Sequence, residues 1–197
     1  DRAVVSGIPV HEKFGQPLDR AQCRKALGLT ERFTVLLTSA AGLTSDLRDI
    51  AVEMATSGIQ VAAATGNNTR LKRRLDSLGK KTDMVKVFGH TPEMHRLMKA
   101  ADVLVGKAGG LTVSESLAMG LPLIIYNPVP GQEIYNVDFL VNSGAGLLSR
   151  DEEDVVEKVS FLSTHPERLQ QMAGNAALLG KPNAAQTVCE RVLASIR

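Results

Sequence analysis

Two polar segments of this 197-residue chain combine residue types that bind phosphorylated ligands. The first is Lys107-Ala-Gly-Gly-Leu-Thr-Val-Ser-Glu115, and the second is Pro130-Gly-Gln-Glu-Ile-Tyr-Asn136. Glycine lets the backbone approach a ligand closely, and the free amide groups at a helix start attract anions. Glutamate carboxylates accept hydrogen bonds from sugar hydroxyls. The two segments therefore favour a site for phosphate and sugar groups.

The glycine pair of the first segment is the candidate phosphate site. Gly109 and Gly110 lie directly before a helix that the sequence predicts over residues 112–119. Loop and helix amides in this arrangement bind phosphate, and Lys107 would complement a diphosphate. A tight strand-to-helix turn without a ligand explains the same glycines, and the G-x-G-x-x-G dinucleotide pattern is missing. The glycines by themselves leave both interpretations open.

Glu115 also has two interpretations. Thr112 and Glu115 have the T-x-x-E spacing of a capping box, in which the glutamate bonds to the amide of the capping residue. Alternatively, a carboxylate one turn into a helix beside a phosphate site would accept paired hydrogen bonds from a ribose diol. The spacing does not separate the structural role from the binding role.

The second segment begins with a Pro-Gly turn and continues into a helix predicted near residues 133–142. Gln132, Glu133 and Asn136 then have helical spacing, and their side chains would hydrogen-bond to hexose hydroxyls. An ordinary polar helix start explains these residues as well, since the helix dipole favours a negative charge such as that of Glu133 at this position. Asn has a low helix propensity, so its presence at position 136 slightly favours the binding role.

Weaker candidates follow two other predicted strands. Ser39, Ala40 and Gly42 form a loop of small residues that would admit a close ligand, although many such loops are only turns. Phe88 and Gly89 end another strand, where the phenylalanine either borders a flat base or packs in the core. The four histidines show no spacing typical of a metal site or a catalytic triad, so we expect no bound metal.

Alternating strands and helices must position these segments. Apolar runs predict buried strands, and segments with a 3.6-residue apolar period predict helices. The predicted strands are 34–38, 59–64, 84–88, 102–105, 121–125 and 145–148. The predicted helices are 45–57, 69–79, one that starts at 91 with Pro92 in its first position, 112–119, 133–142, 151–163, 166–176 and 184–196. The alternation predicts an α/β domain with a Rossmann-like, doubly wound parallel sheet. Ligands bind such sheets at the carboxyl ends of the strands, where both polar segments lie.

The composition is that of an ordinary globular protein, with 44% hydrophobic and 22% charged residues. A formal charge of +2 and the absence of Trp argue against nucleic acid as a partner. The basic runs at 72–74 and 80–81 form a solvated face or contact anionic lipid. Cys23 and Cys189 match no metal or redox spacing, so we expect reduced thiols in a cytosolic protein. No apolar run approaches the roughly 18 residues that cross a bilayer.

Two strings in the chain resemble the donor-binding half of family 28 glycosyltransferases. One runs from Ala101 to Pro122 and contains K-A-G-G-L-T-V-S-E, and the other runs from Pro128 to Asn136 with the form P-x-P-G-Q-E-x-x-N. Both forms are most similar to the glycolipid branch of the family, which includes monogalactosyldiacylglycerol synthases and processive diacylglycerol glucosyltransferases. The resemblance covers most of the chain and is strongest over 84–146.

The resemblance implies the C-terminal half of a GT-B fold, with residues 1–20 as an interdomain linker and residues 21–197 as the donor-binding domain. It implies no metal and no cofactor, because the UDP-hexose donor is the substrate. Glu115 would hold the ribose, the 107–112 segment the diphosphate, the second segment the hexose, and the backbone near Phe88 the uracil. The implied donor-binding residues are Ser39, Phe88, Gly89, Lys107, Gly109, Gly110, Leu111, Thr112, Glu115, Gln132, Glu133 and Asn136.

The implied activity is the inverting transfer of a hexose from a UDP-sugar to a lipid acceptor, as in the synthesis of glycosyl-diacylglycerol. The family's acceptor site and general base belong to an N-terminal domain, so we expect no catalytic residue here and little activity from this chain alone. The start at Asp1 without Met favours a piece of a longer protein. We expect that protein to be cytoplasmic and peripheral on the inner face of the membrane. Three alternatives stay open: the soluble donor subunit of a split glycosyltransferase, a UDP-sugar 2-epimerase, and a non-enzymatic nucleotide-sugar-binding module.

Overall fold

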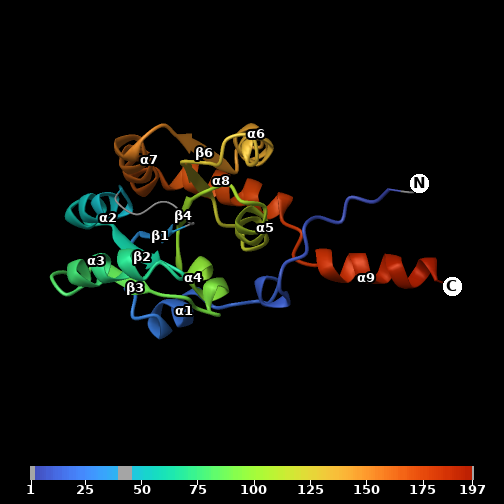
Figure 1. Ribbon diagram of the computed structural model, residues 1–197, viewed down its shortest axis with the longest axis horizontal. Coiled ribbons are helices and arrows are strands. Elements are labelled where there is room, and N and C mark those ends of the chain that lie inside the picture. The colour runs from blue at the N-terminus through green and yellow to red at the C-terminus, as the bar shows by residue number, and fades with distance from the viewer. Residues whose placement is uncertain (1–2, 40–45, 197) are drawn as a thin grey trace.

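The computed structural model describes residues 3–39 and 46–196, which form a parallel sheet with helices on both faces (Figure 1). Within the described residues the sheet has six strands in the order β3-β2-β1-β4-β5-β6, and every neighbouring pair is parallel. The strands are β1 (Thr34–Thr38), β2 (Gln60–Ala64), β3 (Val85–Phe88), β4 (Val103–Gly106), β5 (Leu123–Tyr126) and β6 (Gly146–Ser149). The Rossmann-like, doubly wound α/β fold predicted from the sequence is confirmed.

The helices divide between the two faces of the sheet. Residues of α2, α3 and α7 pack into one apolar cluster, and residues of α1, α4, α5 and α6 pack into the other. Helix α8 contributes Met172 to the first cluster and Ala176 to the second. The helices are α1 (Arg20–Ala26), α2 (Asp46–Thr56), α3 (Thr69–Gly79), α4 (Met94–Ala100), α5 (Gly110–Ala118), α6 (Ile134–Asn142), α7 (Glu152–Thr164), α8 (Pro166–Leu179) and α9 (Ala184–Ser195), with a short 3-10 helix η1 (Glu12–Phe14).

The central strands are buried on both faces, which explains why they are continuous apolar runs in the sequence. Every residue of β2, β4 and β5 is buried. The edge strands β3 and β6 are only partly buried. Parallel sheets covered by helices on both sides require such double-faced apolar strands, so sequence and architecture agree.

Helix α1 lies where the sequence predicts no helix. Asp19 caps it by accepting a hydrogen bond from the Gln22 amide at 2.7 Å. Cys23 and Arg24 are its buried residues, so a charged side chain occupies a position that an apolar pattern would assign to an aliphatic one. The segment before it also joins the fold, because Val10 and Phe14 are buried in the cluster that includes α1 and α4.

Arg24 is part of a partly buried ionic network around α1, in which its Nη1 also pairs with the exposed Glu31 at 3.0 Å. Its Nη2 donates to Asp102 Oδ2 at 3.0 Å, while Arg20 Nη2 donates to Asp102 Oδ1 at 2.5 Å. Asp102 Oδ2 also accepts a hydrogen bond from the Thr34 amide at 2.8 Å. Asp102 therefore ties α1 to the start of β1 and to the segment before β4, at the end of the sheet opposite the predicted site.

Helix α4 begins later than predicted. The sequence places Pro92 in its first position, but the helix starts at Met94 and residues 92–93 form a turn. The Thr91 hydroxyl accepts a hydrogen bond from the Glu93 amide at 3.1 Å. This local turn competes with helix formation, so it delays the helix start.

Helix α9 extends away from the sheet beside the N-terminal segment (Figure 1). Its C-terminal apolar side chains are largely exposed, with Val192 at 51% and Leu193 at 62%. Gly7 lies against Lys181 and Ala184, so the N-terminal segment contacts the start of this helix. No helix within the described residues is both long enough and apolar enough to span a membrane.

Candidate functional site

The strand order places a topological switch point between β1 and β4. From β1 the chain winds outward to β2 and β3, then returns to β4 and continues to β5 and β6. The helices that follow β1 and β4, α2 and α5, lie on opposite faces of the sheet, and a switch point of this kind opens a crevice at the carboxyl edge. Ligands of open α/β sheets bind in this crevice. The first polar segment follows β4 directly, so the structure places it there.

Gly106 and Thr38 form the floor of the crevice, where β1 and β4 approach closely. The Thr38 hydroxyl donates to the Val105 carbonyl at 3.2 Å. A Cβ atom at position 106 would overlap Thr38 Oγ1, so any residue larger than glycine would force the Thr38 side chain to shift.

The first turn of α5 offers free amide groups at this edge. Gly109 is the capping residue in an extended conformation, with φ −64° and ψ 141°, and no side chain caps the helix. The helix begins at Gly110, two residues earlier than the sequence predicts. Unpaired amides at a helix start carry partial positive charge and favour an anion. The geometry is therefore compatible with a phosphate site at residues 109–112.

The early start of α5 excludes the capping box. Thr112 lies inside the helix, so it is not the capping residue to which Glu115 would return. Glu115 is half-buried, and none of the described residues forms a hydrogen bond or an ion pair with its carboxylate. Burial raises the pKa of Glu115. A partly desolvated carboxylate without a partner among the described residues is available to a ligand, and perturbed groups of this kind are enriched at functional sites.

Glu133 and Asn136 lie beside the glycine loop but also have structural partners. Glu133 is buried and precedes α6, and its Oε2 accepts a hydrogen bond from the Val129 amide at 2.9 Å. Its Oε1 faces Gly109, where a Cβ atom would lie 3.4 Å away. Asn136 Nδ2 donates to the Ala108 carbonyl at 2.8 Å. Asn136 thus ties the start of α6 to the loop after β4, while Glu133 closes the loop after β5 on itself; neither role was predicted from the sequence.

Asn127 also shapes the loop after β5 and was missed from the sequence. Its φ is +50°, in the left-handed region that Asn tolerates better than most residues. It turns the chain directly after Tyr126, before the segment that leads to Glu133. The Asn-Pro pair at 127–128 is a turn signal that would have identified it.

Ser39 lies at the end of β1, on the crevice side of the switch point. Its amide donates to the Ala64 carbonyl at 3.0 Å. Its hydroxyl is buried and lacks a hydrogen-bond partner within the described part of the chain. A buried polar atom without a partner is uncommon, and a ligand oxygen would satisfy it. The predicted loop residues Ala40 and Gly42 lie outside the described residues.

The other predicted site residues are more dispersed. Phe88 ends β3 two strands away from β1, packs partly against the core, and its carbonyl accepts from the Thr65 amide and hydroxyl at 2.8 and 3.1 Å. Gly89 lies next to the Lys72 side chain. Lys107 is half-buried at the crevice. Leu111 and Gln132 are exposed on the rim.

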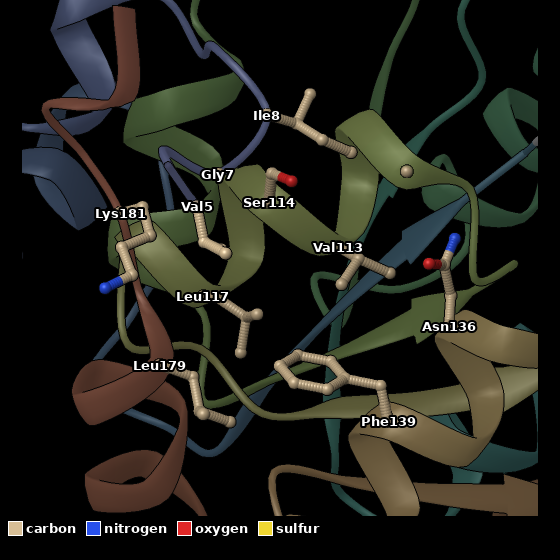
Figure 2. A pocket seen from close by; sticks show the side chains of 11 residues that line it. Val5, Gly7, Ile8, Val113, Ser114, Leu117, Asn136, Phe139, Leu179 and Lys181 are labelled. Carbon is tan, nitrogen blue, oxygen red and sulfur yellow. The ribbon is translucent and has the colours of Figure 1, made fainter. Parts of the chain in front are cut away.

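A largely apolar hollow of about 220 Å³ opens beside the crevice (Figure 2). Gly110, Ser114 and Asn136 line it from α5 and α6, so it is continuous with the candidate site. Its apolar wall comes from Val5, Ile8, Val113, Leu117, Phe139 and Leu179. Residues 1–20 are predicted as a linker from the sequence, in which no local pattern indicates that Val5 and Ile8 reach α5. Within the described residues, no group of three or more potential metal ligands is present.

The strand order of the sheet, the crevice at its switch point and the helix that begins at Gly110 define a Rossmann-like domain. Domains of this kind are found in GT-B glycosyltransferases. Residues 38–188 match the glycosyltransferase family 28 C-terminal domain, and the chain belongs to this family. It is 31% identical over 193 residues to the processive diacylglycerol beta-glucosyltransferase of Bacillus pumilus, covering 96% of this chain and 50% of that protein. The chain thus spans about half the length of the curated relatives it matches.

Solved structures share the fold at lower identity. Acinetobacter baumannii MurG matches with a TM-score of 0.68 and 19% identity, covering 92% of this chain and 55% of that chain. Anabaena HepE, solved in complex with UDP and glucose, matches with a TM-score of 0.69 and 16% identity, covering 93% and 54%.

Proposed function

We propose that this domain binds a UDP-hexose for an inverting glycosyltransferase that transfers the sugar to a lipid, as in the synthesis of glycosyl-diacylglycerol. Membership of family 28 supports the reaction class, and the diacylglycerol glucosyltransferase named above supports a lipid acceptor. The observation that carries the proposal is Glu115. Its carboxylate, which has no partner among the residues that the structure describes, lies on the helix whose free first-turn amides open at the switch point.

In this proposal the parts of the donor are distributed along the crevice. Amides of Gly109, Gly110, Leu111 and Thr112 bind the diphosphate, Lys107 adds positive charge, and the Ser39 hydroxyl bonds to a phosphate oxygen. Glu115 accepts hydrogen bonds from the ribose diol. These assignments are supported by the free amides, the unpartnered carboxylate and the unpartnered hydroxyl described above.

The hexose and the base lie at the two ends of the donor. Gln132, Glu133 and Asn136 face the hexose. Glu133 and Asn136 use their remaining acceptor oxygens, since one polar atom of each is already bonded to the Val129 amide or to the Ala108 carbonyl. The backbone at Phe88 and Gly89 reads the uracil edge. The Phe88 carbonyl already accepts two hydrogen bonds, which favours the Gly89 backbone as the reading group.

The proposed chemistry is a single displacement at the anomeric carbon. The acceptor oxygen bonds to that carbon while the bond to the diphosphate oxygen breaks, and the electron pair leaves with UDP. Fixed amides at the start of α5 stabilise the negative charge that develops on the diphosphate. The acceptor proton goes to a general base that a separate N-terminal domain supplies, so residues 21–197 act as the donor half.

We further propose that the whole protein works at the cytoplasmic face of the membrane as a peripheral enzyme. A lipid acceptor requires access to the bilayer. The apolar hollow beside Asn136 supports this, because it adjoins the position proposed for the hexose.

Calorimetry with UDP and 2′-deoxy-UDP tests the proposal. The wild-type chain should bind UDP, and Glu115→Gln should weaken binding roughly tenfold to a hundredfold, because charge-assisted hydrogen bonds contribute about 1.5–3 kcal/mol. Removing the 2′-hydroxyl should weaken wild type but hardly affect the variant, since both changes delete the same contact. Glu157→Gln, an exposed carboxylate on α7, is the control. Absence of UDP binding, or equal binding by Glu115→Gln, would refute the assignment.

A further inference from the structure

Four arginines from two helices gather around one hollow on the outer face of the domain. Arg48 of α2 and Arg70, Arg73 and Arg74 of α3 line it together with Ser77, and its volume is about 420 Å³. The hollow is shallow and open to solvent. Helices α2 and α3 pack side by side on the same face of the sheet, away from α6 and α9 (Figure 1).

The spacing on α3 produces this arrangement. Its three arginines and Ser77 follow positions i, i+3, i+4 and i+7 from Arg70, so they form a single stripe along the helix. Leu71 and Leu75 form the adjacent stripe and are buried against the sheet. Burial of the leucine stripe therefore fixes the direction of the arginine stripe toward α2.

The hollow holds positive charge that the neighbouring residues neutralise only in part. Among the described residues that line it there is no carboxylate. Arg48 pairs with Asp49 at 2.8 Å. Arg70 and Arg73 are exposed and form no ion pair or hydrogen bond with any described residue. Like charges three or four residues apart on a helix repel each other and destabilise it. A bound anion would offset this repulsion between the arginines of α3.

We propose that this arginine hollow binds phosphate groups, supplied either by the headgroups of an anionic lipid surface or by free phosphate. The planar guanidinium group matches phosphate oxygens in pairs, which makes arginine the suited residue for this ligand. Lipid headgroups as the phosphate source rest on the membrane association proposed above, and the arginine hollow would then be the part of the domain that contacts the membrane.

The position of the hollow agrees with such a role. Helices α2 and α3 follow β1 and β2, so their first turns lie at the carboxyl edge of the sheet, as the donor crevice does. Arg48 and Arg70 belong to these first turns. Lipid phosphate bound at these arginines would keep the carboxyl edge of the sheet, and the donor crevice on it, close to the bilayer that contains a lipid acceptor.

Vesicle binding by the 197-residue chain tests the lipid source. Co-sedimentation is measured with phosphatidylcholine vesicles that contain or lack phosphatidylglycerol. The double variant R70Q/R73Q should bind the anionic vesicles about thirtyfold more weakly, since a basic residue at such a surface contributes about 1 kcal/mol. The double variant K80Q/K81Q removes the same charge from exposed residues outside the hollow, and should change binding less than about threefold.

Calorimetric titration with inorganic phosphate tests the free-phosphate source. Loss of phosphate binding in R70Q/R73Q alone, with vesicle binding unchanged, would support the hollow and assign it to free phosphate. Equal losses in the two double variants, or no binding of either probe by wild type, would overturn the proposal. UDP titration of the same variants separates this site from the donor site: unchanged UDP affinity is expected, and weaker UDP binding in R70Q/R73Q would show that the hollow belongs to the donor site.

Discussion

Replacing Gly106 by alanine probes the close approach of β1 and β4 that forms the floor of the crevice. The new Cβ atom would overlap the Thr38 hydroxyl oxygen, whereas the Thr38 Cβ would lie 3.7 Å away in ordinary contact. The clash therefore involves one atom. Thr38→Ala removes that atom together with the Cγ2 methyl group and leaves the Cβ atom in place.

The expected magnitudes follow from these contacts. Overpacking a tight interior position costs about 1–3 kcal/mol, so Gly106→Ala should lower the free energy of unfolding by that amount. Thr38→Ala should cost about 1–2 kcal/mol, because it deletes the hydrogen bond to the Val105 carbonyl and a methyl group. The double variant should be no less stable than Gly106→Ala, since removing the hydroxyl relieves the overlap. The loss in the double variant should therefore be about 1–2 kcal/mol smaller than the sum of the two single losses, which is the coupling energy between the two sites.

Urea denaturation followed by circular dichroism measures all four proteins of this cycle. Gly174→Ala is the matched control, because a Cβ there meets nothing within 4 Å in the middle of α8. That control should gain roughly 0.5–1 kcal/mol from helix propensity. Strictly additive losses for Gly106→Ala and Thr38→Ala would refute the argument that a single atomic overlap demands glycine.

Three further predictions follow from other contacts. Asp102→Ala should lower the free energy of unfolding by about 1–3 kcal/mol, because it removes the acceptor of the Thr34 amide and one of the two carboxylates that pair with Arg24, and a loss below about 1 kcal/mol in urea denaturation would contradict this. Burial raises the pKa of Glu115 above its ordinary value of 4.5. The contribution of this residue to the free energy of unfolding is therefore fully present below pH 4.5 and is lost as the pH rises through the pKa of the folded state. Glu115→Gln should therefore gain stability relative to wild type as pH rises toward neutrality, and a parallel pH dependence of the two melting temperatures would disprove it. Asn136→Ala should cost about 1 kcal/mol through the bond to the Ala108 carbonyl and should weaken UDP-sugar binding more than UDP binding; equal calorimetric losses for both ligands would contradict a hexose contact.

The sheet could be predicted from the sequence because its strands are buried on both faces. Double-faced burial requires continuous apolar runs such as Leu123–Tyr126, and these are visible without any tertiary information. Helix α1 could not be predicted in this way. Its buried Arg24 is compensated by Asp102, which lies far away in sequence, so the local pattern reads as polar.

Candidate site residues could be listed from the sequence, but their roles could not. Thr112 and Glu115 fit a capping box by spacing, and only the start of α5 at Gly110 excludes it. Asn136 was predicted as a ligand-binding side chain, and its bond to the Ala108 carbonyl, 28 residues away, became visible only when two loops met. Local spacing cannot report a partner that is brought near by the fold.

What the sequence determined by itself is the order of strands and helices, the resemblance to family 28 and the two polar segments that follow β4 and β5. Periodicity and short motifs are local properties, so they survive without a three-dimensional context. The tertiary structure alone decided that β1 and β4 are neighbours, that Glu115 lacks a partner among the described residues, and that Arg48 joins the arginine stripe of α3. Each of these depends on segments far apart in the chain, whose proximity is a consequence of packing both faces of one sheet.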